Sequence, residues 1–130
     1  MRTFTLTVRP GRFAVCRLAA AAAAPPAPPA TAVLYSVTRT ADELSIVCPE
    51  AEAPAGAVVE GGWRVLTLAG PFDLNTEVGV LVRILQPLAD AGVGIFALST
   101  YDTDHVLVHD AQLPQAVAAL QAAGHTVDDA

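Results

Sequence analysis

The sequence has 130 residues, of which 53% are hydrophobic, so the chain can bury the core of one compact domain or of two very small ones. Its formal net charge is −6, and its seven basic residues are all arginines scattered along the chain, which argues against a nucleic-acid-binding protein. It contains no run of about eighteen apolar residues free of proline and charge, so we expect no membrane span. The location that we expect for the protein is cytoplasmic.

The two cysteines, Cys16 and Cys48, stand far apart in apolar, strand-like runs. We expect both to be buried free thiols that act as small hydrophobic side chains. The sequence has neither a CxxC pair nor a Cys/His cluster, so we expect no metal site.

The N-terminal segment begins with an alternating run at residues 3–8, which predicts a strand. Pro10 and Gly11 mark a turn, and residues 13–18 predict a second strand. An Ala/Pro-rich stretch at residues 19–30 follows, which we interpret as an insertion or loop and not as a signal peptide. Residues 19–24 suit a short helical turn, and the prolines after them favour extended geometry.

Further along, the pattern predicts strands at residues 32–37 and 44–48, joined by a turn at residues 38–42. Residues 49–62 are rich in Ala, Pro, Gly and Glu and are expected to form a connection. Residues 63–69 form a short apolar run that predicts another strand.

The strongest pattern in the chain follows this strand. A polar, turn-rich loop at residues 70–77 precedes apolar residues at helical spacing from Val78 to Leu88. Asn75 or Thr76 can cap this helix. Pro87 predicts a kink or a break near Gln86, and Gly92 can end the helix in the left-handed conformation.

The remaining C-terminal residues complete the alternation of strands and helices. Residues 95–98 predict a strand, residues 99–103 a polar turn, and Val106 and Val108 a third strand. A one-faced helix is expected from Leu113 to Leu120, with a short strand at residues 125–127. The order strand, helix, strand, strand, helix, strand is a βαββαβ unit.

An internal similarity relates the two halves of the chain. Residues 36–47 (SVTRTADELSIV) and 99–108 (STYDTDHVLV) both place Ser before a polar turn and an alternating strand. With a two-residue gap, Thr40 and Asp42 align with Thr103 and Asp104. We interpret the chain as two copies of one motif that meet near Gly61, the first of them degenerate.

The segment SVTRTADELSIVCPE and residues 87–108 resemble the bacterial tandem ACT-domain proteins. A more distant resemblance is to the regulatory part of aspartate kinases and to the cytosolic arginine sensor. The resemblance covers nearly the whole chain and implies an α+β fold of two ACT-like, ferredoxin-like βαββαβ modules with antiparallel sheets. We expect these modules at residues 1–60, which include the Ala/Pro-rich insertion 19–30, and at residues 61–130.

The resemblance also implies a dimer that binds a small molecule, typically an amino acid, at an interface between modules. In that family the ligand lies against the loop after the first strand, here Phe72 to Leu81, and against the turn after the second strand, here Ser99 to Asp102. The ligand-binding residues expected from it are Asp73, Asn75, Thr76, Val78, Gly79, Val80, Leu81, Ser99, Thr100 and Asp102.

Two departures from the family pattern limit what the resemblance implies. Relatives that bind lysine place a carboxylate on the second strand, where this chain has Phe96, which argues against lysine. The Ala/Pro-rich stretch stands where the helix of the first module should be, so we expect that module to lack a full helix.

The residues themselves support a ligand site on physical grounds. The N-terminus of a helix offers unpaired amides and a positive dipole end to a carboxylate, and Gly79 would let a ligand approach the backbone. Asp73 and Asp102 could pair with an ammonium group. Each residue also has a plain structural role: Asn75 and Thr76 as helix caps, Asp102 in the hairpin turn, Asp73 in solvent and Gly79 in helix packing.

Catalysis has little support in the sequence. Ser36 and Ser99 lack the glycine-flanked elbow of a hydrolase nucleophile. His105 and His109 would lie about 13 Å apart on a strand, too far to share a metal. We expect a non-enzymatic, amino-acid-binding sensor without a cofactor, which forms a homodimer through exposed edge strands. The alternative is a dimerisation module with no ligand.

Overall fold

The computed structural model describes residues 2–26 and 32–129, and its contacts divide the chain into two units. One unit contains the residues up to Pro10 together with those from Arg64 onward, and the other contains residues 11–63. The sequence pattern placed the first strand with residues 1–60, whereas the contacts group it with the C-terminal part of the chain. Its hydrogen-bond partners explain this grouping, because they all lie beyond residue 64.

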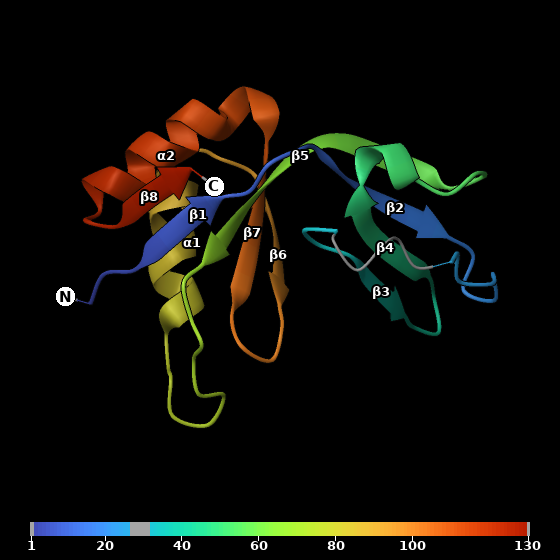
Figure 1. Ribbon diagram of the computed structural model, residues 1–130, viewed down its shortest axis with the longest axis horizontal. Helices are drawn as coiled ribbons and strands as arrows, with labels where there is room; N and C mark the ends of the chain where they lie inside the picture. Colours follow the sequence, from blue (N-terminus) through green and yellow to red (C-terminus); the bar gives the residue numbers. More distant parts are fainter. Residues whose placement is uncertain (1, 27–31, 130) are drawn as a thin grey trace. The chain divides into compact units, whose positions relative to one another are not determined.

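The larger unit is a βαββαβ module (Figure 1). Its elements are β5 (Val58–Leu68, from Arg64 onward), α1 (Val80–Asp90), β6 (Ile95–Ser99), β7 (Asp104–His109), η2 (Asp110–Gln112), α2 (Leu113–Ala122) and β8 (Thr126–Asp129). The N-terminal strand β1 (Thr5–Val8) joins this sheet, antiparallel to β5 and parallel to β8. The strand order in this unit is therefore β6-β7-β5-β1-β8.

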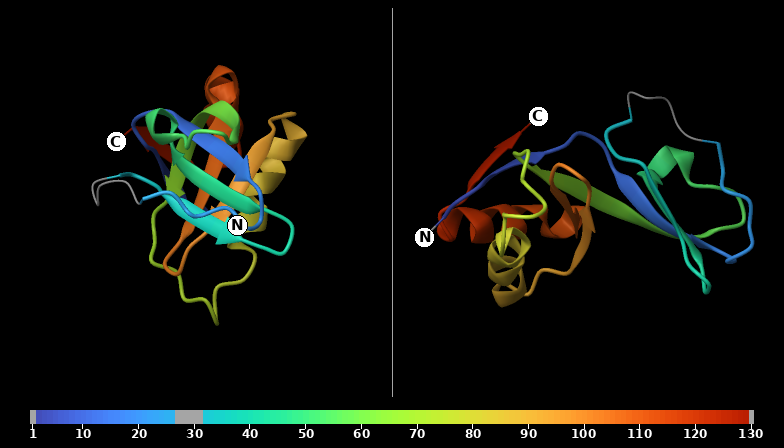
Figure 2. Two further views of the ribbon diagram at one scale, coloured as in Figure 1. Left: turned by 90° about the vertical axis from the view of Figure 1, so that its right-hand side faces the viewer. Right: turned by 90° about the horizontal axis from the view of Figure 1, so that it is seen from below.

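Both helices lie on one face of this sheet and build the core with it (Figures 1 and 2). The expected alternation holds in β1 and the residue before it, where Phe4, Leu6 and Val8 are buried. The helices contribute residues at helical spacing, which include Val80, Ile84 and Leu88 from α1 and Ala116 and Leu120 from α2. Burial of each large aliphatic side chain stabilises the unit by about 1.5–3 kcal/mol.

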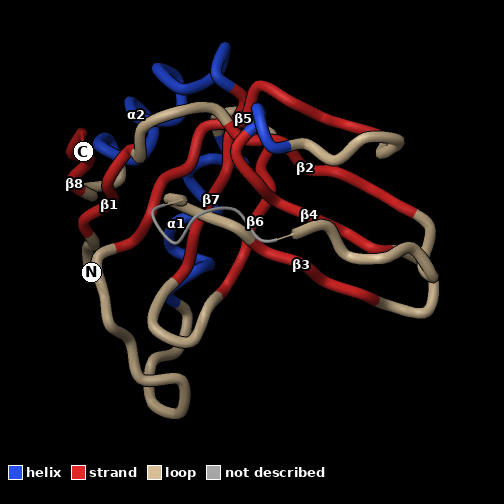
Figure 3. Tube along the Cα trace, turned by 45° about the vertical axis from the view of Figure 1, so that its right-hand side comes forward, coloured by secondary structure: helices blue, strands red, loops and turns tan. Residues whose placement is uncertain are grey.

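The smaller unit is an antiparallel sheet whose strands run side by side (Figure 3). It contains β2 (Phe13–Leu18), β3 (Ser36–Arg39), β4 (Leu44–Pro49), the short helix η1 (Glu50–Glu52) and the first half of β5. The expectation that residues 49–62 form a connection is wrong in part, because β5 already begins at Val58 and pairs with β2. Within residues 11–26 and 32–63, the structure has no α-helix, so the described part of this unit agrees with the expected degenerate module.

The cysteines and the alanine run lie in this smaller unit. Cys16 and Cys48 are buried free thiols, as predicted, and burial is the main cause that raises the pKa of Cys48 to about 12. Residues 19–24 form only a turn, in which the amide of Ala22 donates to the carbonyl of Ala19 over 2.9 Å. Residues 27–31 of the expected insertion lie outside the described part of the chain.

Helix α1 corrects two expectations about its ends. It begins at Val80 with no side-chain cap, so the predicted caps Asn75 and Thr76 are wrong. Gly79 takes the N-cap position with a left-handed φ of 75°, which favours glycine over every other residue. The preceding residues instead form a turn in which the amide of Asn75 donates to the Asp73 carboxylate.

The helix also continues through Pro87 to Asp90, so of the kink or break predicted near Gln86, the break is wrong. Proline has no amide hydrogen, and its place in the helix leaves the carbonyl of Arg83 without its usual donor. His125 fills this gap, because its Nε2 lies 3.1 Å from the Arg83 oxygen. A hydrogen bond from the side chain of His125, near the C-terminus, thus replaces the backbone hydrogen bond that the proline removes.

The two segments that resemble each other in sequence both form a β-hairpin, but their equivalent residues differ from those that the sequence alignment paired. The hairpin between β3 and β4 is closed by the amide of Thr40 and the carbonyl of Glu43, over 2.9 Å. The hairpin between β6 and β7 is closed by Thr100 and Thr103 in the same way, over 2.8 Å. Thr40 therefore corresponds to Thr100, and the alignment of Thr40 with Thr103 is wrong.

Candidate functional site

Two loops of the larger unit are held against each other at one end of its sheet. The amide of Phe72, in the loop between β5 and α1, donates to the carbonyl of Asp102 in the β6–β7 turn over 2.7 Å. The hydroxyl of Thr103 donates to the carbonyl of Leu68 over 2.7 Å. A Cβ at Gly70 would lie 2.9 Å from the Asp102 oxygen, so only glycine allows this approach.

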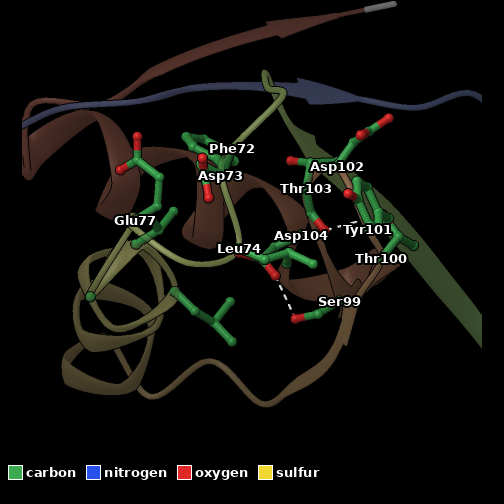
Figure 4. A pocket seen from close by; sticks show the side chains of 13 residues that line it. Phe72, Asp73, Leu74, Glu77, Ser99, Thr100, Tyr101, Asp102, Thr103 and Asp104 are labelled. Carbon is green, nitrogen blue, oxygen red and sulfur yellow. Dashed lines mark hydrogen bonds between the residues drawn. The ribbon is translucent and has the colours of Figure 1, made fainter.

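These two loops and the start of α1 enclose a hollow of about 240 Å³ (Figure 4). Its volume is below the range of about 300–1,000 Å³ that is typical of pockets for drug-sized ligands, so it suits a small metabolite. The residues that line it are Phe72, Asp73, Leu74, Glu77, Gly79, Val80, Leu81, Ser99, Thr100, Tyr101, Asp102, Thr103 and Asp104.

The structure brings seven of the ten residues named from the sequence to this hollow: Asp73, Gly79, Val80, Leu81, Ser99, Thr100 and Asp102. The other three do not line it. Asn75 borders a neighbouring depression beside Pro71, and the amide of Thr76 donates to the carbonyl of Asp73. Val78 points into solvent with 79% of its surface exposed.

Six further residues line the hollow: Phe72, Leu74, Glu77, Tyr101, Thr103 and Asp104. The first four lie inside the two loop ranges expected from the sequence, 72–81 and 99–102, although they were not named individually, and only Thr103 and Asp104 lie outside both. The most informative of these is Asp104, which begins β7 and alternates with the buried Val106 and Val108. The period of two on a strand places all three on the helix-covered face. This alternation was visible in the sequence and could have assigned Asp104 to the site.

The hollow is rich in carboxylates, and its described lining contains no basic residue. Figure 4 shows Asp73 and Asp104 facing the space between the loops, while the Asp102 carboxylate turns away from it. The Ser99 hydroxyl donates to Asp104 over 2.5 Å. Glu77 forms an ion pair with Arg2, and this hydrogen bond is the main cause that lowers the pKa of Glu77.

The opposite wall of the hollow is the N-terminus of α1. The first intrahelical bond runs from the amide of Arg83 to the carbonyl of Gly79 over 3.3 Å. The amides of Val80 and Leu81 precede this bond and have no partner within the helix, so the wall carries the positive end of the helix dipole. A hollow with amides on one side and carboxylates on the other is suited to a zwitterion.

The described residues contain no group of three His, Cys, Asp or Glu side chains that could hold a metal ion. His105 contacts the hydroxyl of Thr67 through Nδ1 over 2.9 Å. None of the helices in residues 2–26 and 32–129 is long and apolar enough to cross a membrane.

Comparison with known proteins identifies the family of this module. The ACT-domain family model matches residues 58–122, from the start of β5 to the end of α2. This chain belongs to the ACT-domain family. A second model, for an N-terminal domain, matches residues 11–56, which is most of the smaller unit. The α+β fold with ferredoxin-like topology agrees with the resemblance drawn from the sequence.

Three relatives show how far the similarity extends. A crystal structure of an Agrobacterium tumefaciens protein is 35% identical, covers 100% of this chain and 96% of its own, and superposes with a TM-score of 0.87. The regulatory subunit of aspartate kinase from Thermus flavus shares the fold with a TM-score of 0.60, at 11% identity over 95% of this chain and 97% of its own. The bovine cytosolic arginine sensor for mTORC1 subunit 1 is 29% identical over 61% of this chain and 27% of its own length. This ACT-domain chain spans about half or less of the curated relatives that it matches.

Proposed function

We propose that this ACT-domain protein is a non-enzymatic regulatory module that binds a free amino acid in the hollow between the β5–α1 loop and the β6–β7 turn. The observation that carries the proposal is the polarity of the hollow, with helix amides on one wall and carboxylates on the other. The family supports it, as do the names of two relatives, an arginine sensor and a regulatory subunit. The expected homodimer and cytoplasmic location stay predictions.

The carboxylate of the amino acid would accept hydrogen bonds from the amides of Val80 and Leu81 at the start of α1. Its ammonium group would contact Asp104 and Asp73, whose carboxylates face the hollow (Figure 4). The sequence pattern suggested Asp102 for this role. Its backbone carbonyl instead accepts the hydrogen bond from the Phe72 amide that connects the two loops. Asp104 keeps its place through the Ser99 hydroxyl.

Apolar side chains supply the surface for the rest of the ligand. Phe72, Leu74 and Tyr101 all line the hollow, and the last two expose 63% and 80% of their surface. A ligand that covers Leu74 and Tyr101 would remove this apolar surface from water, which favours binding by about 25 cal/mol per Å².

The test is a thermal-shift screen against the twenty amino acids. A ligand that binds only the folded protein adds roughly 2.7 kcal/mol of stability at a hundred times its dissociation constant. For each hit, the N-acetyl derivative and the C-terminal amide should lose the shift, because each removes one charge of the zwitterion. No shift with any amino acid, or equal shifts with both derivatives, would refute the proposed zwitterion site.

A variant pair localises the binding. Asp104→Asn keeps the size of the side chain and an acceptor for Ser99 but removes the charge, so it should weaken binding at least tenfold. Asp128→Asn, on the exposed strand β8, makes the same charge change outside the hollow and should leave affinity unchanged. Equal affinities in the two variants would place the ammonium elsewhere.

A second candidate function is an interaction module that binds no ligand. The observation that favours it is an exposed groove between the two helices of the larger unit, apart from the hollow. Under this alternative, no amino acid shifts the melting temperature, whereas the molar mass rises with protein concentration.

A further inference from the structure

The groove lies along the exposed faces of α1 and α2 and has a volume of about 740 Å³. Most of its lining is small or apolar. One side consists of Val82, Arg83, Gln86, Pro87 and Asp90 from α1, with Ala91 directly after it. The other side consists of Ala119 and Ala122 from α2, with Ala123 and His125 beyond its end. Val82 contributes an aliphatic side chain with 66% of its surface exposed to this groove, on a helix that buries its other face in the core.

The charged groups in this groove are arranged along one helix. Arg83 and Asp90 are seven residues apart, which is close to two helical turns and places them on one face about 10 Å apart. They carry opposite charges, and the described contacts of Asp90 consist of a hydrogen bond from Gln86 Nε2 over 2.8 Å.

We propose that this groove binds a second copy of the chain, with the two α1 helices antiparallel across a twofold axis. In this arrangement Arg83 of each copy faces Asp90 of the other, so both charges are paired at once. The same register sets the exposed Val82 against Ala91 of the second copy, a large side chain against a small one. Gln86 and Pro87 then lie next to the axis.

A second copy fits the groove because the surface is complementary to itself. An unrelated partner would need its own matching charges, whereas a twofold axis between residues 86 and 87 supplies them. The rival contacts are the two edges of this sheet in the described part of the larger unit: β6, which pairs with β7, and β8, which pairs with β1. The most exposed large side chain of β6, Ile95, has 36% of its surface exposed, against 66% for Val82 on the helix face.

The experiment measures the molar mass of the full chain by sedimentation and light scattering over a range of concentrations. The parent should form a dimer. Arg83→Glu and Asp90→Arg each place like charges opposite one another, so each variant should weaken the dimer at least tenfold. Asp128→Arg, on the exposed strand β8, is the control with the same charge change as the second variant and should leave the dimer intact. Circular dichroism establishes that every variant is folded.

The decisive step is to mix the two weakened variants. In a mixed pair, the glutamate introduced by Arg83→Glu meets the arginine introduced by Asp90→Arg, and the unchanged Asp90 of the first copy meets the unchanged Arg83 of the second. The mixture should therefore form a heterodimer with close to the parent affinity, although oppositely charged helix faces would attract in other registers too. The double variant should dimerise with itself for the same reason. It tests the register itself, because in a parallel pairing it would meet only like charges.

Three results would overturn the proposal: a monomeric parent at every concentration, dimers that survive both charge substitutions, or no heterodimer in the mixture. If Ile95→Lys abolishes the dimer while the charge variants keep it, the contact lies at the β6 edge instead. Amino-acid binding is not part of this measurement, so its outcome leaves the proposed ligand site untouched.

Discussion

His125 joins three elements of the larger unit, and its replacement by alanine should be among the most damaging single changes. The ring is 6% exposed and stacks on Phe4 with centroids 5.8 Å apart. Its Nδ1 accepts the amide hydrogen of Phe4 over 3.1 Å, so the neutral ring carries its proton on Nε2. That proton is donated to the carbonyl of Arg83, the group that Pro87 leaves without a donor.

The expected cost of His125→Ala follows from these contacts. The buried amide of Phe4 loses its acceptor, at about 1–3 kcal/mol, and the Arg83 carbonyl loses its donor, at about 1 kcal/mol. The lost ring stacking adds about 0.5–1.5 kcal/mol. We expect a loss of about 3–5 kcal/mol, a large part of the about 5–15 kcal/mol that stabilises a typical domain.

Urea denaturation measures this loss, and a double-mutant cycle tests its cause. Pro87→Ala restores an amide hydrogen that can bond to the Arg83 carbonyl within the helix. In that background, His125→Ala should cost about 1 kcal/mol less than in the parent. A cost below about 1 kcal/mol for the single change, or additivity of the two changes within about 0.3 kcal/mol, would refute the reasoning.

Three further changes test other parts of the larger unit. Gly79→Ala should destabilise by about 1–2 kcal/mol because its φ is 75°, whereas Gly94→Ala, the matched control in open space, should not. This sign is opposite to that expected for a glycine inside a helix, and a stabilised Gly79→Ala would contradict it. Gly70→Ala should cost about 1–3 kcal/mol and open the joint between the two loops, seen as faster amide exchange in both. Burial, and then the charge of Arg9, lowers the pKa of His105 from its ordinary 6.5, so the unfolded chain binds more protons and stability should fall as the pH drops below about 6.5. His105→Gln should flatten this fall in urea titrations at about pH 7.5 and about pH 5.5, and an unchanged slope would assign it to other groups.

Much of the fold could be predicted because its signals are local. The alternation of Phe4, Leu6 and Val8 and the spacing of Ile84 and Leu88 depend only on the geometry of one strand or one helix. Gly92 ends α1 in the left-handed conformation, as expected. The two loops that form the hollow were identified for the same reason, since polar turns and a helix start are short-range patterns.

The missed features depend on partners far away in the chain. The caps Asn75 and Thr76 suited a helix start, but the loop turns earlier and Gly79 takes the cap position. Pro87 predicts a break only as long as the donor from His125 is unknown. The alternation with Val106 and Val108 could have placed Asp104 on the helix-covered face, but which loop faces it across the hollow depends on the tertiary structure.

The sequence by itself determined the kinds of elements, the apolar faces that they bury and the loops that carry polar groups, because each of these follows from residues a few positions apart. Only the tertiary structure decided that the N-terminal strand β1 lies between β5 and the C-terminal strand β8 in the sheet. The same is true of the carboxylates that face the start of α1 and of the side chain that replaces the hydrogen bond lost at Pro87. These features arise from hydrogen bonds and packing between distant segments, and a local pattern does not specify which distant segment will be the partner.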